Sequence, residues 1–412
     1  MLHIPPALRY RRYAFLWVGL IISIAGSQMQ VAALLWHLRT LSDLPIVVSG
    51  IGLARAVPIL LLAPFGGVLA DTFNRRKILF FTQAIMLLTA TTLGVLTWAG
   101  LIRIWHIYLI TFIQAVAVSF DSPARQSLIP NLLPRHILPS AFSLQSIASN
   151  TGSIVGPALS GIVIASLGQQ FTYLFNAASF LAVIAALVAM GSVPQELRPV
   201  KLDANYSFTS VREGFHFILH QPIILSSMLM DFAATFFSSA NTLLPFVARD
   251  LLGLNEVAYG WLLSAESIGA MCVGLVLSQR TQVRQQGRLL VTAVIAYGMA
   301  TVMLGLSRTF WMAALGLALV GACDSVSTIL RNTIRQLQTP DHIRGRMVGI
   351  NQMFFQGGPQ LGEIESGIAA QLLGPSAAIV FGGIGCIAVV TAIVSRWPQL
   401  WRYQGEEAPA AA

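Results

Sequence analysis

Long apolar segments separated by short polar connections constrain the fold of this chain more than any other feature. Hydrophobic residues make up 55% of the sequence, and charged residues only 10%. A helix needs about 20 apolar residues to cross the hydrocarbon core, where only helices and closed barrels satisfy their backbone groups. The pattern therefore predicts an all-α membrane protein with twelve transmembrane helices, near residues 14–38, 46–70, 78–100, 104–129, 140–166, 170–191, 222–248, 256–279, 288–306, 309–333, 347–373 and 375–396.

Positive charge gathers in alternate connections between these segments. Most Lys and Arg residues, including Arg331 and Arg335, fall on one side, and Arg55 falls inside a span. The other side carries only Arg39, Arg103, Arg249 and Arg308. Because loops rich in Lys and Arg stay in the cytoplasm, we expect a multi-pass protein of a bacterial inner (plasma) membrane with both termini cytoplasmic. This topology accounts for the net charge of +9 without a nucleic-acid partner.

An internal repeat indicates two similar halves. An ungapped shift that places Arg125 on Arg331 also superimposes two loops, 134–137 on 340–343, and the small residues of the helices that follow them. Such repeats are typical of transporters built from two related helical bundles. We expect an N-terminal six-helix bundle over 1–191, a cytoplasmic linker over 192–221, a C-terminal six-helix bundle over 222–396 and a cytoplasmic tail over 397–412.

The connection between the second and third predicted helices carries an acid followed by a cluster of cations. It resembles the loop motif Gly-x-x-x-Asp-Arg/Lys-x-Gly-Arg-Arg/Lys of the major facilitator superfamily, with Thr72 and Asn74 as departures from it. The resemblance implies a major facilitator fold and a gating role for this loop and for Arg125. The alternative is an ordinary short loop that follows the positive-inside rule. The matching positions are Gly67, Asp71, Arg75 and Arg76.

A run of small residues around a proline marks the fifth predicted helix. Small residues four apart allow close helix packing, and a proline removes a backbone donor. The run is similar to the Gly-Pro-x-x-Gly-Gly motif of drug:proton antiporters, and with segments 121–126 and 338–346 it resembles the branch that includes enterobactin exporters. Helix packing alone is the alternative explanation. The residues concerned are Gly152, Gly156, Pro157 and Gly161.

Ionisable residues inside the predicted spans are the candidates for coupling, because each is costly in the bilayer and usually serves a pathway. We place all the acids in the second half and the only cation, Arg55, in the first. Arg55 and Glu266 are predicted at similar depths and are expected to face each other across a cavity. The alternative for each residue is a buried polar pair between helices. The acids are Asp231, Glu266, Asp324, Glu363 and Glu365.

Glu363 and Glu365 cannot both face that cavity, since two residues on a helix are about 200° apart. Glu363 is our choice of the two, because the repeat places it on Pro157. Glu266 and Glu363 are thus the first candidates to carry a proton, ahead of Asp231 and Asp324.

These resemblances imply a secondary active transporter that exports an apolar or amphipathic small organic compound, such as a drug or a siderophore, in exchange for protons. An importer or a lysolipid flippase of the same fold, and a non-transporting receptor or scaffold, are the alternatives. The sequence contains no nucleotide-binding or hydrolase motif and no metal-ligand spacing, so we expect no enzyme activity, cofactor or metal. The expected partners are the substrate, protons and membrane lipids, with the chain acting as a monomer.

Asp71 should serve gating rather than substrate recognition, because it lies at the end of a span beside the loop. Asp71→Asn is expected to slow transport without changing which compounds bind, as measured by flux and binding in parallel. A wild-type rate together with lost binding would contradict the assignment.

Overall fold

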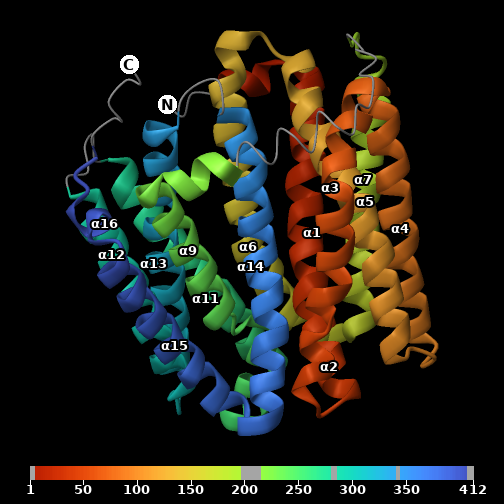
Figure 1. Ribbon diagram of the computed structural model, residues 1–412. Coiled ribbons are helices and arrows are strands. Elements are labelled where there is room, and N and C mark those ends of the chain that lie inside the picture. The colour runs from red at the N-terminus through yellow and green to blue at the C-terminus, as the bar shows by residue number, and fades with distance from the viewer. Residues whose placement is uncertain (1–4, 196–214, 280–284, 340–343, 406–412) are drawn as a thin grey trace, which may run out of the picture. The chain divides into compact units, whose positions relative to one another are not determined.

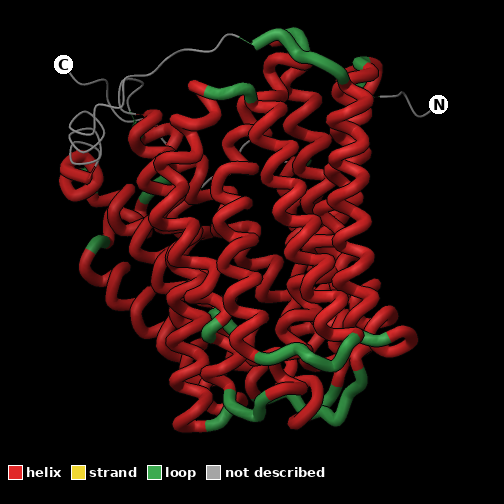
Figure 2. The backbone as a smooth tube through the Cα atoms, turned by 90° about the vertical axis from the view of Figure 1, so that its right-hand side faces the viewer, coloured by secondary structure: helices red, strands yellow, loops and turns green. Residues whose placement is uncertain are grey.

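The computed structural model describes residues 5–195, 215–279, 285–339 and 344–405, apart from the side chains of residues 63–64, 67–68, 71 and 344–356. Figure 2 shows that these residues form helices joined by loops, with no strand among them. The expected all-α membrane fold is therefore confirmed. Eleven segments in this part of the chain are long and apolar enough to cross a membrane.

Twelve helical regions correspond to the twelve predicted ones. In the first half these are α1 (Arg11–Leu41), α2 with α3 (Pro45–Ser49 and Ile51–Thr72), α4 (Arg75–Trp98), α5 (Ile104–Leu132), α6 (Leu138–Leu167) and α7 (Gln169–Met190). In the second half they are α9 with α10 (Pro222–Phe237 and Leu244–Phe246), α11 (Glu256–Ser278), α12 (Gln286–Gly305), α13 (Phe310–Gln338), α14 (Arg344–Leu373) and α15 (Pro375–Arg396). The short elements η1 (Pro6–Arg9), η2 (Arg135–Ile137), η3 (Asn241–Leu243), η4 (Val247–Leu251) and α16 (Pro398–Arg402) complete the described fold.

The seventh predicted helix is interrupted where the sequence predicted a continuous span over 222–248. Helix α9 ends at Phe237, and the chain continues through η3, α10 and a π-helical turn, η4. Polar residues over 238–241 begin the interruption, and Pro245, which has no backbone N–H, sits in the first turn of α10. The interruption thus coincides with the polar residues Ser238, Ser239 and Asn241.

The chain divides into two compact units. Unit 1 comprises Met1–Asp43, Leu53–Leu202 and Asn255–Ser264, and unit 2 comprises Leu44–Gly52, Asp203–Leu254 and Ala265–Ala412. In unit 1, α1 packs against α6 and α7, and α4 packs against α5 and α7 (Figure 1). In unit 2, α12 packs against α13 and α15, and α14 packs against α9. The short segments 44–52 and 255–264 therefore pack with the unit formed mainly by the other half of the sequence.

Glycines set the closest helix contacts at equivalent places of the two units. A methyl group on Gly156 of α6 would lie 2.7 Å from the Ala25 carbonyl oxygen in α1. A methyl group on its repeat partner Gly362 of α14 would lie 2.5 Å from the Phe236 carbonyl oxygen in α9. Lipid provides no hydrophobic drive for helix association, so close approach at small residues takes its place.

The next small residues of the repeat, Gly161 and Gly367, receive the two short segments. A side chain on Gly161 would collide with the Glu256 carbonyl oxygen, and one on Gly367 would collide with Ser49. Tyr259 completes the contact in unit 1 by donating a hydrogen bond to the Ala32 carbonyl oxygen at 3.2 Å. Each unit thus anchors the beginning of one helix whose remainder belongs to the other unit.

Replacing Gly156 by leucine should destabilise the protein, because overpacking a close contact costs about 1–3 kcal/mol. Gly362→Leu should act in the same way in unit 2. The measurement is the midpoint of thermal denaturation in detergent. Gly274→Leu is the matched control, since the nearest atom to a methyl group there is the Ser325 Oγ at 3.9 Å. Equal midpoints for Gly156→Leu and Gly274→Leu would contradict the packing role.

Candidate functional site

Close packing of α11 against α13 positions the acids of the second half. Side chains on Gly269 or Gly321 would run into the backbone of the facing helix, at Ala318 and Glu266 respectively. The two helices therefore approach backbone to backbone around Glu266. Asp324, one turn beyond Gly321 on α13, lies close enough to Glu266 for the two carboxylates to repel each other when both are ionised.

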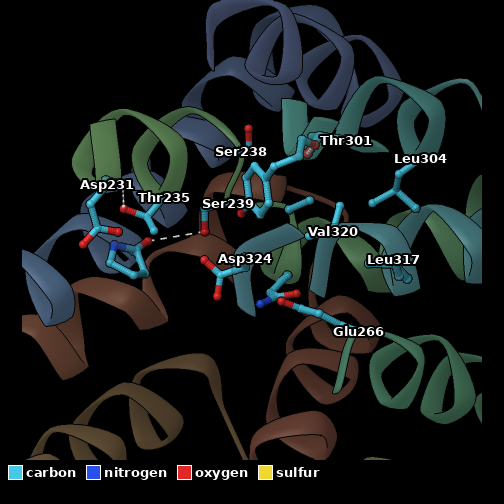
Figure 3. Close-up of a pocket in the computed structure, with 14 residues that line it drawn as sticks. Asp231, Thr235, Ser238, Ser239, Glu266, Thr301, Leu304, Leu317, Val320 and Asp324 are labelled. Atoms are coloured by element: carbon cyan, nitrogen blue, oxygen red, sulfur yellow. Dashed lines mark hydrogen bonds between the residues drawn. The ribbon is translucent and has the colours of Figure 1, made fainter. Parts of the chain in front are cut away.

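A cavity of about 240 Å³ lies within unit 2 beside this contact. Its polar lining comes from α9, the interrupted region after it, α11, α12 and α13, and Figure 3 shows Asp324 between Asp231 and Glu266. The interrupted region after α9 supplies hydroxyl and amide groups, and α12 and α13 supply an apolar wall. The lining residues are Asp231, Thr235, Ser238, Ser239, Ala240, Asn241, Glu266, Tyr297, Thr301, Leu304, Leu317, Val320, Asp324 and Pro359.

Arg331 forms a buried ion pair with Asp231. The Arg331 Nη1 lies 2.6 Å from the Asp231 Oδ1, and both side chains are almost completely buried. The Arg331 Nη2 is 3.9 Å from an Asp324 carboxylate oxygen and also donates a hydrogen bond to the Thr328 Oγ1 at 2.8 Å. Removing two charges from water is tolerable only when they compensate each other at short range, as Arg331 and Asp231 do here.

This pair corrects the sequence prediction that Arg55 is the only cation inside the spans. Arg331 and Arg335 were assigned to a cytoplasmic connection, but α13 runs to Gln338, and the two arginines are 1% and 8% exposed. The carboxylate of Asp231 on α9 makes the burial of Arg331 possible. The spacing of seven residues between Asp324 and Arg331 places both on one face of α13, but it gave no indication of Asp231 on α9.

The three carboxylates of the cavity are held differently. Asp231 is paired with Arg331 at 2.6 Å, Glu266 lies near the Asn241 side chain, and the Asp324 side chain is 45% exposed and 3.9 Å from Arg331. The residues that line the cavity include no Lys, Arg or His. Glu266 and Asp324 therefore lie in the cavity without a cation as close as the one that Asp231 has.

Two other candidates from the sequence lie elsewhere. Glu363 is not among the lining residues, and its Oε2 lies where a methyl group on Gly52 would come within 2.5 Å. Glu365 is half-buried on the same helix, α14. Arg55 lies in α3, within unit 1. Its expected pairing with Glu266 of unit 2 stays a prediction.

The predicted gating arginines bind helix ends within unit 1. The Arg75 Nε donates to the Ala70 carbonyl oxygen at 2.9 Å, and its Nη1 donates to the Asn131 Oδ1 at 2.7 Å. The Arg76 Nε donates to the Leu187 carbonyl oxygen at 2.8 Å, in the last turn of α7. Cations favour helix C-termini, where carbonyl groups lack partners. The side chains of Gly67 and Asp71 lie outside the described residues.

Arg125 forms an ion pair with Asp121 on the same helix, α5. Asp121 is 1% exposed and also accepts hydrogen bonds from the Thr82 Oγ1 at 3.0 Å and the Gln83 Nε2 at 2.9 Å. The prediction that all intramembrane acids belong to the second half is therefore wrong. Asp121 lies inside the span predicted over 104–129, but it was considered only as part of the motif of segment 121–126. Arg125 and Arg331, which the repeat equates, thus both pair with a buried aspartate.

The antiporter-like residues are packing positions in unit 1. Gly152 and Gly156 face α1, while Gly161 and the Pro157 carbonyl oxygen face the beginning of α11 at Glu256 and Gly260. No group of three or more His, Cys, Asp or Glu side chains arranged to hold a metal ion occurs among the described residues.

Comparison with known proteins identifies relatives over nearly the whole chain. The sequence profile of the family described as transmembrane secretion effector, a branch of the major facilitator superfamily, matches residues 5–406. The MFS-type transporter YfiS of Bacillus subtilis (strain 168) is 24% identical, covering 85% of this chain and 84% of its own. The multidrug efflux pump Tap of Mycolicibacterium fortuitum is 24% identical, over 85% of this chain and 87% of Tap. The enterobactin exporter EntS of Shigella boydii serotype 18 is 24% identical, over 82% of this chain and 80% of EntS.

Solved structures share the fold at low sequence identity. The crystal structure of a POT family transporter in complex with 5-aminolevulinic acid superimposes with a TM-score of 0.76 at 11% identity. The match covers 95% of this chain and 96% of that one. The fold is therefore that of major facilitator transporters, which are not enzymes.

Breaking the pair of Arg331 and Asp231 should destabilise the protein by about 3–5 kcal/mol, because the remaining charge is left buried without compensation. Arg331→Met and Asp231→Asn are each expected to lower the denaturation midpoint, and the double variant Arg331→Met with Asp231→Leu should recover much of the loss. Asp43→Asn is the control for an exposed pair, since Asp43 is 90% exposed beside Arg39. A double variant less stable than either single one would contradict a mutually compensating pair.

Proposed function

Because the chain belongs to the transmembrane secretion effector family of the major facilitator superfamily, we propose that it exports a small organic compound in exchange for protons. Membership of this family makes the chain a membrane transporter of small molecules. The direction of transport, the coupling ion and the class of substrate go beyond this family membership and are our proposal. The observation that carries the proposal is the cavity of unit 2, where no cation is paired with Glu266 among the described residues and Asp324 has only Arg331, at 3.9 Å.

A carboxylate without a cation is costly when charged and enclosed. Insertion scales give a cost of about 2.5–3.5 kcal/mol for an ionised aspartate at the centre of a bilayer helix. Protonation removes most of this cost by neutralising the carboxylate. Water in an open cavity also removes it, by solvating the charged carboxylate. Glu266 and Asp324 therefore favour the proton when the cavity is closed to water and release it when the cavity is wet, which couples protonation to the state of the cavity.

Arg331 and Asp231 have a different part in this proposal. Their short, buried pair holds Arg331 beside Asp324 at 3.9 Å. The positive charge of Arg331 attracts the Asp324 carboxylate whenever that carboxylate is charged. It thereby supplies a reason for the proton to leave once water enters. We accordingly place Glu266 and Asp324 first as proton carriers, with Asp231 as the partner that positions Arg331.

The cavity supports an amphipathic substrate. Carboxylates and serine hydroxyl groups line one part of it, and Leu304, Leu317 and Val320 line another (Figure 3). The Asn241 amide also lines the cavity. Most small-molecule sites combine an apolar wall with a few convergent polar groups. The printed names of two relatives, a multidrug efflux pump and an enterobactin exporter, also favour export of an organic compound.

Gating is assigned in this proposal to the helix ends and glycine contacts of unit 1. Arg75 and Arg76 donate hydrogen bonds to carbonyl groups in the last turns of α3 and α7. When these helices move, the hydrogen bonds must break or the arginines must move with the helices. Gly156 and Gly161 hold α6 against α1 and against the beginning of α11. With the positive connections in the cytoplasm, the loop of Arg75 and Arg76 lies on the cytoplasmic side.

An importer or lipid flippase of the same fold is the second possibility, and the direction of flux distinguishes the two. In sealed vesicles of known orientation, an inward proton gradient should drive the substrate out of the cytoplasmic compartment. Accumulation in that compartment under the same gradient would favour import.

Neutralising the true proton carrier should abolish uphill export driven by a pH gradient while leaving downhill exchange of substrate. Exchange needs the conformational cycle but no net proton movement. We expect this result for Glu266→Gln, for Asp324→Asn or for both, measured as substrate flux in proteoliposomes with and without a pH gradient.

Glu363→Gln and Asp231→Asn are included because the sequence alone ranked Glu363 beside Glu266 and placed Asp231 with Asp324. Asp250→Asn, at an exposed position of η4, is the matched control and should retain both activities. Gradient-driven export that survives in all four test variants would eliminate proton coupling through these acids. Loss in Glu363→Gln alone would move the coupling site from the cavity to α14.

A further inference from the structure

A second cavity, of about 430 Å³, lies within unit 1. It lies between the end of α3 and the helices α4 and α5, which pack against each other (Figure 1). Its walls are almost entirely apolar, with Phe73, Phe81, Ile85 and Phe120 as the large side chains. We refer to it as the α4–α5 groove.

The groove faces outward. Phe73 is 58% exposed and Phe81 is 68% exposed, far above what a packed core position allows. In a membrane-spanning chain, an exposed apolar groove of this kind is in contact with lipid chains or with another apolar ligand. Exposure alone does not distinguish binding of a specific lipid from contact with the bulk bilayer. The charge at the end of the groove is the feature that could select a particular lipid.

Lys77 lines the end of the groove nearest the α3–α4 connection. It is exposed, and in the part of the chain that the structure describes its ammonium group has no carboxylate within ion-pair distance and no hydrogen bond. The neighbouring Arg76 is already bound to the Leu187 carbonyl oxygen. A cation at the end of an apolar groove is complementary to an anionic headgroup attached to an acyl chain.

The length of the groove agrees with one leaflet. Lys77 and Ile85 are eight residues apart on α4, which is about 12 Å at 1.5 Å per residue. Half of the hydrocarbon core is about 15 Å thick. A headgroup at Lys77 thus places its acyl chain along Phe81 and Ile85 within a single leaflet.

We propose that the α4–α5 groove is a binding site for an anionic phospholipid, with the lipid phosphate on Lys77 and one acyl chain against Phe81, Ile85 and Phe120. The inference rests on unit 1 alone and is independent of the proton cycle in unit 2. A bound headgroup there would neutralise the one exposed cation of this groove, beside the connection that carries Arg75 and Arg76.

The test uses the full-length protein in nanodiscs that contain trace photoactivatable lipids with identical diazirine-bearing chains. One lipid has a phosphatidylglycerol headgroup and the other a phosphatidylcholine headgroup. After photolysis, peptide mass spectrometry locates the labels. About 1 kcal/mol per cation near an anionic surface corresponds to about a fivefold preference. We therefore expect phosphatidylglycerol to label segments 81–85 and 116–120 about five times more than phosphatidylcholine does.

Variants assign the preference to Lys77. Lys77→Gln should abolish the preference, and Lys77→Arg should retain it. Arg12→Gln, at another exposed cation of unit 1 outside the groove, should leave it unchanged. Phe81→Ala should lower labelling by both lipids, whereas Leu88→Ala, at an exposed position of α4 outside the groove, should not.

Three outcomes would overturn the proposal. Equal labelling by the two lipids means that the groove holds only bulk lipid. A preference that survives Lys77→Gln means that another cation recognises the headgroup. Displacement of the label by free glycerol 3-phosphate means that the site recognises a soluble phosphate rather than a lipid.

Discussion

Backbone-to-backbone contact between helices is the constraint on which the rest of this structure depends. In water, helices are driven together by apolar burial, but lipid removes that drive, and close approach must supply the attraction instead. Gly156 and Gly362 permit it at equivalent places of the two units, and Gly269 and Gly321 permit it between α11 and α13. The last contact has a chemical result, because it sets Glu266 and Asp324 side by side. Glycines, which have no functional side chain, thus determine where the two carboxylates lie.

The fold was largely predictable from the sequence because a bilayer leaves few choices. Apolar segments of sufficient length must be helices, and the repeat that equates Arg125 with Arg331 indicated two related halves. The exceptions were local. The interruption after Phe237 was read as a continuous helix, since its apolar residues hide Ser238, Ser239 and Pro245 from a test of average hydropathy.

The candidate site was only partly predictable. Asp231, Glu266 and Asp324 were identified from their cost in the membrane, and all three line one cavity. Arg331 was missed, because a charge near the end of a span is normally assigned to the adjacent loop. Only the arrangement of α9 and α13 shows that an aspartate compensates for it. Asp121 was missed for a related reason, since its partners Thr82 and Gln83 come from another helix. Pairing across helices is a tertiary property that residue spacing within one helix does not contain.

The interruption after α9 affects how the cavity binds water. Ser238, Ser239 and Asn241 line it with dipoles that do not titrate, and the Ser239 hydroxyl also donates a hydrogen bond to the Pro359 carbonyl oxygen at 3.3 Å. When the carboxylates are neutral, these dipoles still offer hydrogen bonds to water. The cavity therefore keeps an affinity for water at every stage of titration. In the proposed transport cycle, rehydration can then begin on these uncharged groups, before any carboxylate has given up its proton.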